Sequence, residues 1–210
     1  QLVSLKEVAI DMPAGPSEVE VIADESANPA FIAADFLSQA EHGVDSQAML
    51  VTASESIVEP IMQAIREQLD RLPRKEITEK SLSHSRLIVL KDKQEVIDFT
   101  NLYAPEHLII QTTDYADIAG QVENAGSVFM GSYTPESAGD YASGTNHTLP
   151  TNGYAKAYSG VNLDSFIKKI TFQEITADGI RLLGGTIRTM AANEQLDAHR
   201  NAVTIRLNTI

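Results

Sequence analysis

The sequence predicts an α/β fold in which a mainly parallel sheet is flanked by helices and followed by a C-terminal helical segment. Short runs of β-branched and apolar residues alternate with segments whose apolar residues recur at helical spacing. Strands and helices that alternate in this way form units whose strands run parallel. The last strand pattern ends at Met130, and beyond Leu163 the pattern becomes helical. The predicted class is therefore α/β, with an incomplete Rossmann-like sheet.

The first strand of this sheet is predicted at Val19–Ala23, a short β-rich run. The helix that follows has Ser26 or Asn28 as its N-cap and Pro29 at its first position, where a missing N–H costs nothing. Apolar residues then recur at helical spacing until Gly43, which is a typical helix stop.

Further elements follow in alternation up to residue 130. Ala48–Thr52 is typical of a buried strand, and Ile57–Leu72 is a strongly amphipathic helix that ends before Pro73. The remaining predicted elements are strand Arg86–Leu90, helix Lys93–Leu102, strand His107–Gln111, helix Tyr115–Val122 and strand Ser127–Met130.

The last third of the chain changes character. Residues 132–160 are rich in small and polar residues, which indicates a functional loop or a linker. Helices are predicted at Ala177–Asn193 and Leu196–Leu207, and Gly184-Gly185 weakens the middle of the first. Two helices are too few to bury a core alone. We therefore expect them to dock on the rest of the chain or on another subunit.

Composition excludes several classes of function. The net charge of −13 argues against nucleic acid and against an anionic membrane as partners. No stretch is apolar enough to span a bilayer, and no signal-peptide pattern opens the chain, so we expect a cytoplasmic protein. The absence of cysteine rules out disulfides, thiolate zinc sites and cysteine nucleophiles.

Two short segments carry candidate chemistry. Glu106 and His107 stand side by side just after Pro105, and an adjacent carboxylate and imidazole at a rigid bend suit acid–base catalysis. Gln39 and His42 lie three residues apart near a helix end, so they face one side. Such a pair can ligate a metal, although it is more often a cap and a surface hydrogen bond.

The other residues with catalytic or metal-binding side chains allow both a functional and a purely structural interpretation. Asp140 and His147 lie in a stretch dense in small residues, which is either a ligand-binding loop or a plain turn. His199 opens the last amphipathic helix, near Glu194, and a lone helical histidine is more often a surface residue. His84 has no motif around it. Nucleotide-binding G-x-G-x-x-G, P-loop and H-E-x-x-H motifs are all absent, so the residues alone predict a soluble α/β protein with a metal or acid–base site.

Five motifs occur together and in one order. They are DMPAGPSEV at Asp11–Val19, LSQAEHG at Leu37–Gly43, YAPEHL at Tyr103–Leu108, PESAGDYASGTNH at Pro135–His147 and AHRNAV at Ala198–Val203. Together they resemble the C-terminal half of the histidinol dehydrogenase family. The resemblance covers nearly the whole chain, and five ordered motifs are far more specific than any one of them.

The resemblance implies a zinc-containing homodimer that oxidises L-histidinol, a small molecule, to L-histidine in two NAD-dependent steps through an aldehyde-level intermediate. It implies that zinc holds the substrate. The implied zinc ligands are Gln39, His42, Asp140 and His199. Glu106 and His107 would be the acid–base pair. Ser17, His107 and Glu194 would contact the substrate alongside the zinc ligands.

The resemblance also implies how the chain is divided. Residues 1–18, with a strand-like run at Glu7–Asp11, would be an entry segment from a preceding domain, carrying a substrate-contact motif. Residues 19–162 would be the α/β domain with the zinc and acid–base residues. Residues 163–210 would be a dimer-forming tail that acts in trans. The NAD-contacting residues would lie in the family's N-terminal half, so we expect this chain alone to be inactive.

Two other functions fit the same residues. One is a non-catalytic module that binds zinc or imidazole, which predicts ligand binding without turnover. The other is a zinc hydrolase that uses Glu106 as the base for a metal-bound water, which predicts hydrolysis without nicotinamide.

Overall fold

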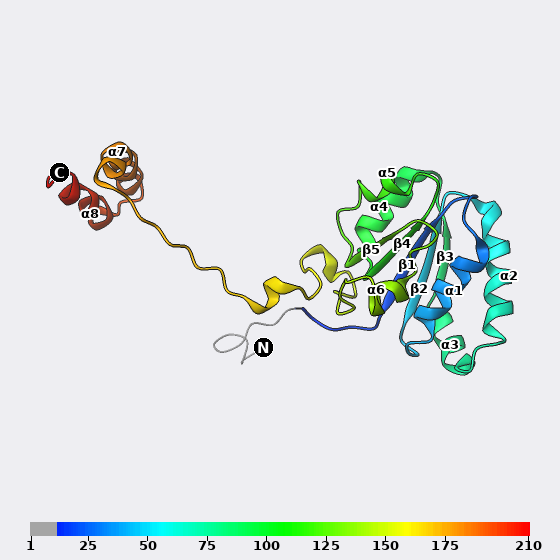
Figure 1. Cartoon of the computed structure of the whole chain (residues 1–210). Helices are drawn as coiled ribbons and strands as arrows, with labels where there is room; N and C mark the ends of the chain where they lie inside the picture. Colours follow the sequence, from blue (N-terminus) through cyan, green and yellow to red (C-terminus); the bar gives the residue numbers. More distant parts are fainter. Residues whose placement is uncertain (1–11) are drawn as a thin grey trace. The chain divides into compact units, whose positions relative to one another are not determined.

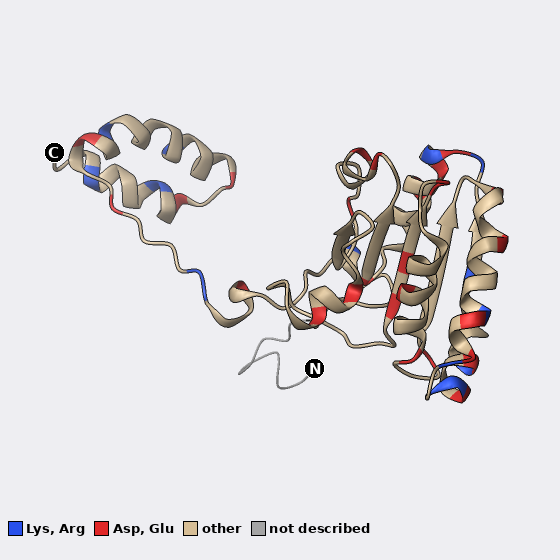
Figure 2. Cartoon of the chain, turned by 45° about the vertical axis from the view of Figure 1, so that its right-hand side comes forward, with Lys and Arg blue, Asp and Glu red and all other residues tan. Residues whose placement is uncertain are grey.

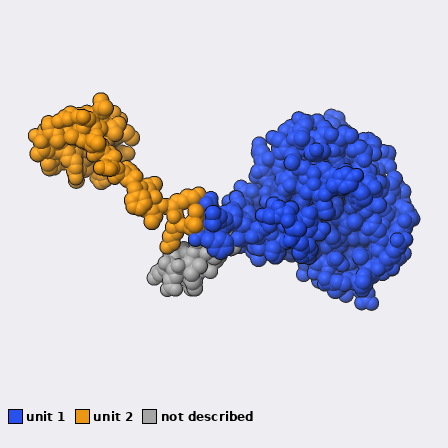
Figure 3. Space-filling view, in the orientation of Figure 1, with its two compact units in different colours: residues 1–166 blue, residues 167–210 orange. Residues whose placement is uncertain are grey.

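The computed structural model describes residues 12–210, so the strand predicted at Glu7–Asp11 lies outside the described residues. The chain forms two compact units, one ending at Phe166 and one running from Ile167 to Ile210 (Figure 3). The sheet lies in the first unit, and the second holds a pair of helices. Within residues 12–210, no helix is both long and apolar enough to cross a membrane.

The sheet consists of five parallel strands in the order β3-β2-β1-β4-β5 (Figure 1). The strands are β1 Glu18–Ala23, β2 Gln47–Thr52, β3 Arg86–Val89, β4 His107–Gln111 and β5 Ser127–Met130. This order matches the first five strands of a doubly wound nucleotide-binding sheet, whose full order is 3-2-1-4-5-6. The prediction of an incomplete Rossmann-like, parallel α/β sheet flanked by helices is confirmed.

Helices cover both faces of the sheet (Figure 1). One face carries α1 (Pro29–Ala40), α2 (Val58–Leu69), α3 (Lys75–Leu82) and α6 (Glu136–Tyr141), and the other carries α4 (Lys93–Tyr103) and α5 (Tyr115–Ala119). The predicted cap of α1 is Asn28, whose side chain accepts a hydrogen bond from Ala30 N at 2.9 Å. Pro29 occupies the first turn as expected.

The central strand β1 is buried along its whole length because helices lie on both sides of it. Alternate residues face opposite ways. Val19 and Val21 pack in the core on the α1 and α2 side, whereas Ile22 packs in the core on the α4 and α5 side. Glu18 and Glu20 therefore share the face of Ile22, and both are buried beneath α4.

Two helices of the first unit were not predicted. Helix α3 has the polar sequence KEITEKSL, and its buried residues, Thr78 and Ser81, give no apolar stripe to read. Helix α6 lies in the stretch predicted as a loop, contains Gly139 and packs against α1. Both helices depend on tertiary packing rather than on an apolar pattern, and that packing routinely overrides propensity.

Some predicted helix bounds were too long. The helix predicted at Ile57–Leu72 begins with a 3₁₀ turn at Glu55–Ile57, and its α-helical part, α2, stops at Leu69. Helix α5 ends at Ala119 rather than at residue 122. The terminal turns of helices are the positions where neighbouring packing most easily changes the backbone.

The second unit is a helix pair, α7 (Ala177–Asn193) and α8 (Asp197–Leu207). Helix α7 is continuous through the two glycines that were predicted to weaken it. A Cβ on Gly184 would lie 2.7 Å from Leu207 Cδ1, so this glycine lets the two helices approach closely. Little of the pair is buried, and Leu182 remains 84% exposed.

Candidate metal and acid–base site

The candidate site lies at the amino ends of β1 and β4. Helix α1 follows β1 and returns to that edge, which brings Gln39 and His42 to it. Helix α6 follows β5, packs against α1, and brings Asp140 to the same place. His107 is the first residue of β4 and pairs with Val19 of β1. Sequence segments far apart thus converge on one edge of the sheet.

The bend that holds the acid–base pair is fixed by the neighbouring strand. Helix α4 ends at Ala104, which takes a left-handed conformation with φ 58°. Gly126 N then donates to Pro105 O at 2.9 Å, and Ser127 N donates to Glu106 O at 2.9 Å. A Cβ on Gly126 would lie 2.5 Å from Glu106 O, so only glycine permits this approach.

Glu106 is buried and held by two donors. Its Oε2 accepts hydrogen bonds from Ser17 Oγ at 2.7 Å and from Glu18 N at 2.9 Å. Burial raises the pKa of Glu106 to about 7, while the two hydrogen bonds act in the opposite direction. Near neutral pH, the carboxyl therefore exists in both protonation states, which suits a group that must take up and release a proton.

The hydrogen bonds of His107 determine its tautomer. Its Nδ1 lies 3.1 Å from the carbonyl oxygen of Glu18, which can only accept, so Nδ1 carries the hydrogen. Burial lowers the pKa of His107, which keeps the ring neutral. Nε2 then has a free lone pair. It finds no hydrogen-bond partner among residues 12–210, and it lies 3.9 Å from Asp140 Oδ1.

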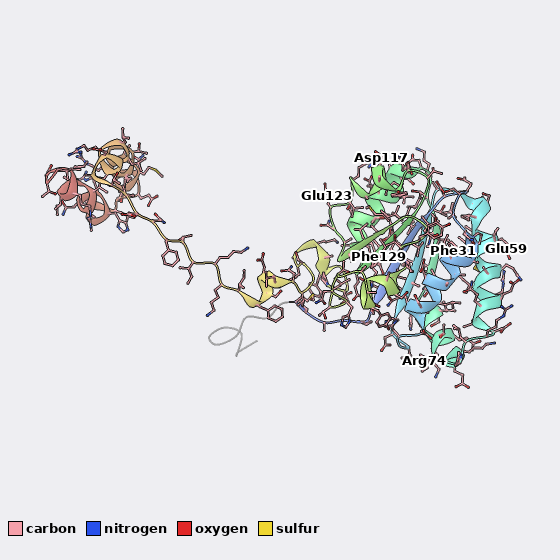
Figure 4. All side chains as sticks on the ribbon, in the orientation of Figure 1. Phe31, Glu59, Arg74, Asp117, Glu123 and Phe129 are labelled. Atoms are coloured by element: carbon pink, nitrogen blue, oxygen red, sulfur yellow. The ribbon has the colours of Figure 1, made fainter. Side chains whose placement is uncertain are left out.

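The ring of His107 is also positioned by packing. Its centroid lies 6.0 Å from that of Phe129, a β5 residue that is labelled in Figure 4. Behind Phe129 lies Gly139 of α6, where a Cβ would approach the Phe129 ring to 2.5 Å. This glycine therefore allows α6, and Asp140 with it, to lie close to His107 at the amino end of β4. His147 of the following loop lies near enough to lower the pKa of His107 further.

His42, Glu136 and Asp140 form a cluster of metal-type donors. One ligand atom from each lies within 4.8 Å of the others. The Nδ1 of His42 is 2.9 Å from the carbonyl oxygen of Ser38, so His42 keeps Nε2 for a metal. Imidazole nitrogen and carboxylate oxygen are donors that zinc accepts.

Gln39, one turn before His42, gives independent evidence. Its side chain is fully buried, yet neither its Oε1 nor its Nε2 has a hydrogen-bond partner within the described part of the chain. Glu136 Oε2 is likewise buried without a partner there. Unpaired buried polar atoms are costly, and a cation could be bound by Oε1 of Gln39 and by Oε2 of Glu136. The residues present therefore fit a divalent metal.

The first unit brings together most of the predicted site residues. Ser17 contacts Glu106, which adjoins His107, and His107 faces Asp140. Glu194 and His199 belong to the second unit, where Glu194 follows the end of α7 and His199 lies in the first turn of α8, both exposed. The roles that the resemblance implies for these two residues stay predictions.

Sequence reasoning missed two buried acids at this site. Glu136 is 1% exposed, and burial, Asp140, Glu106 and Asp35 together raise its pKa to about 9. Asp35 accepts a hydrogen bond from Gln111 Nε2 at 3.0 Å, and burial raises its pKa to about 7. The signal was spacing: Asp35 precedes Gln39, and Glu136 precedes Asp140, by four residues, which places each pair on one helix face.

Comparison with known proteins shows the family to which the chain belongs. The family model described as histidinol dehydrogenase matches residues 1–207. The histidinol dehydrogenase of Bacteroides thetaiotaomicron is 69% identical over 210 residues, which is 100% of this chain and 49% of that protein. The chloroplastic histidinol dehydrogenase of Arabidopsis thaliana is 59% identical over 204 residues, covering 97% of this chain and 44% of that protein.

A solved structure matches as well. The crystal structure of histidinol dehydrogenase from Elizabethkingia anophelis has a TM-score of 0.95 and 56% identity, and the match covers 99% of this chain and 48% of that one. The chain thus spans about half the length of the relatives it matches. With a matching family model and relatives of this identity, the chain belongs to the histidinol dehydrogenase family.

Proposed function

We propose that this chain supplies the zinc-binding and acid–base part of an NAD-dependent histidinol dehydrogenase, which oxidises L-histidinol to L-histidine through an aldehyde-level intermediate. The observation that carries the proposal is the unpartnered Nε2 of His107 on the edge shared with Glu106 and the metal-type donors, within residues 12–210. Membership of the family supports the reaction and the substrate.

Gln39, His42 and Asp140 would hold the zinc, together with His199 of the tail. When bound, zinc would hold the amine and imidazole of the substrate, and NAD would accept a hydride in each oxidation. The residues that contact NAD are proposed to lie outside this chain, so the chain alone is expected to lack dehydrogenase activity.

His107 is the proposed base for the alcohol. Its Nδ1 is committed to the Glu18 carbonyl, so Nε2 accepts the hydroxyl proton as the carbon loses its hydride. Burial keeps the ring neutral and therefore able to accept that proton. Because the ring orientation is fixed, Nε2 is already aligned to accept the proton of the substrate hydroxyl group, and less entropy is lost in reaching the reactive geometry.

Glu106 is the proposed base for the second oxidation. A water molecule must add to the aldehyde carbon, and Glu106 takes a proton from that water as its oxygen attacks. The pKa of Glu106, about 7, makes the ionised form available near neutral pH. Ser17 holds the carboxyl in place through its hydrogen bond of 2.7 Å, in addition to its proposed contact with the substrate.

The tail is proposed to complete the active site of a second copy in a homodimer. Its helices leave Leu182, Met190 and Ile205 exposed by 84%, 59% and 56%, and such apolar surface favours a partner. Glu194 and His199 would then reach the substrate and zinc in trans. Mixing His107→Ala and His199→Ala variants tests this: recovered activity supports sharing, whereas no recovery despite subunit exchange contradicts it.

The reaction itself is tested with Glu106→Gln in the longest natural polypeptide that contains this chain. The amide cannot accept the proton from water, so aldehyde oxidation should slow by about a hundred- to ten-thousand-fold while alcohol oxidation slows less. Stopped-flow detection of NADH separates the two steps. The control is Glu123→Gln, an exposed carboxylate seen in Figure 4.

The same assay separates the other candidate functions. Ligand binding without NADH formation would favour a non-catalytic zinc or imidazole module. Hydrolysis of a substrate without nicotinamide would favour a zinc hydrolase. An unchanged second hydride step in Glu106→Gln would reject the role proposed for this carboxyl.

A further inference from the structure

Glu136 lies in the metal-type cluster but is not among the residues proposed to hold zinc. It stands one helical turn before Asp140 on α6, so the two carboxyl groups share a face. Glu136 is 1% exposed, and its ligand oxygen lies within 4.8 Å of the ligand atoms of His42 and Asp140. Acidic positions on the strands and helices of this unit are coloured red in Figure 2.

The groups around Glu136 favour the binding of a cation. The charged groups that act on it are the carboxyls of Asp140, Glu106 and Asp35, all of one sign when ionised. Its Oε2 has no hydrogen-bond partner in the described chain, and the same holds for Oε1 of the fully buried Gln39, one helical turn before His42. Buried polar atoms without partners are rare in native proteins, so the unpartnered Oε2 of Glu136, in a cluster with His42 and Asp140, indicates a missing ligand.

The charge balance of the metal site indicates a role for the carboxylate of Glu136. The proposed ligands Gln39, His42 and His199 are neutral donors, so Asp140 alone would leave a divalent cation with one uncompensated charge. A second carboxylate would make the site neutral. Glu136 is the buried member of the cluster, so its ionised carboxylate in turn needs a paired cation. Glu136 is in position to supply that second carboxylate.

We propose that Glu136 is a further residue of the metal site, whose carboxylate balances the charge of the bound divalent cation and strengthens its binding. This inference rests on the proposed function, because it assumes the metal site of His42 and Asp140. It assigns Glu136 to cation binding, not to proton transfer.

The test is the affinity for zinc, measured by competition with a chromophoric chelator in the longest natural polypeptide that contains the chain, without substrate or NAD. Glu136→Gln keeps the shape but removes the charge, and zinc affinity should fall about 10- to 100-fold. Glu136→Asp keeps the charge and should lose less. Zinc affinity of Glu136→Gln within twofold of the parent overturns the proposal.

Glu20→Gln is the matched control. Glu20 is also fully buried with an unpartnered Oε2 among the described residues, but it faces α4 on the other side of the sheet. Its replacement should leave zinc affinity unchanged. A fall in zinc affinity as large in Glu20→Gln as in Glu136→Gln would show a general effect of removing a buried carboxyl, and would overturn the proposal.

Two further variants separate this inference from the proposed function. If His42→Ala and Asp140→Asn bind zinc as well as the parent does, the metal site itself is refuted. If they lose affinity while Glu136→Gln does not, only the role of Glu136 is refuted. Should Glu136→Gln fail to fold, Glu136→Ala, which also removes the charge, decides in its place: binding at least several-fold weaker than the parent's supports the proposal, and parental affinity overturns it.

Discussion

Replacing Glu20 by Gln should stabilise the protein, and by more as the pH rises. Glu20 lies in the middle of β1 with no exposed surface, and its Oε1 accepts a hydrogen bond from Thr100 Oγ1 of α4. Burial raises the pKa of Glu20 from 4.5 to about 8, against the opposing effect of the Thr100 hydrogen bond. A glutamine at this position has a similar shape and can accept the same hydrogen bond, but cannot ionise.

The sign and size follow from linkage. Because the folded state holds its proton more tightly, the unfolded state ionises first as the pH rises, and stability is lost between pH 4.5 and about 8. Each unit of pKa difference corresponds to about 1.4 kcal/mol. The parent should therefore lose about 3 kcal/mol by pH 7 and at most about 5 kcal/mol above pH 8 through this group. Below pH 4.5 the contribution is fully retained.

The measurement is urea unfolding of the parent and of Glu20→Gln at each pH from 4 to 9. The difference between the two proteins isolates the contribution of Glu20 ionisation, because all other titrating groups are common to both. The difference in unfolding free energy should be smallest at pH 4 and should grow towards pH 8 in favour of the variant. A difference that stays constant across this range would refute the reasoning, since Glu20 would then have the same pKa in both states.

Three further predictions follow from the packing and the hydrogen bonds. Gly126→Ala should destabilise the fold by about 1–3 kcal/mol in urea unfolding, because the added Cβ would lie 2.5 Å from Glu106 O. Gly185→Ala is the control: its Cβ would meet open space among the described residues, so this variant should be as stable as the parent or more stable. Ile61→Ala should cost about 2–5 kcal/mol, because Ile61 is fully buried, and a loss below 1 kcal/mol would contradict this packing. Ser17→Ala removes a hydrogen bond that lowers the pKa of Glu106, so the pH profile of aldehyde oxidation should move to higher pH; a shift to lower pH would contradict the assignment.

Much of the fold was readable in the sequence because its strong local patterns agree with the tertiary structure. Strands β2 and β4 are buried almost throughout and are mainly apolar, as Leu50 and Ile109 illustrate. Pro29 and the cap at Asn28 mark the start of α1 by local chemistry alone. The bend at Ala104 to Glu106 was likewise visible, because Pro105 cannot continue a helix.

The candidate site was only partly readable. Residue type, spacing and motifs identified five of the site residues: Glu106, His107, Gln39, His42 and Asp140. The local sequence does not indicate which carboxyl groups are buried together. Glu136 joins the cluster only because α6 packs against α1, and that packing depends on residues far apart in the chain.

Hydrophobic period, caps and proline act within a few residues, so they predict most of the helices and strands, the parallel class of the sheet and the motif residues. The strand order, helices α3 and α6, the tautomer of His107 and the raised pKa of Glu106 are visible only in the folded molecule. These properties arise from burial and from contacts between distant segments, such as Ser17 with Glu106, which are 89 residues apart in sequence.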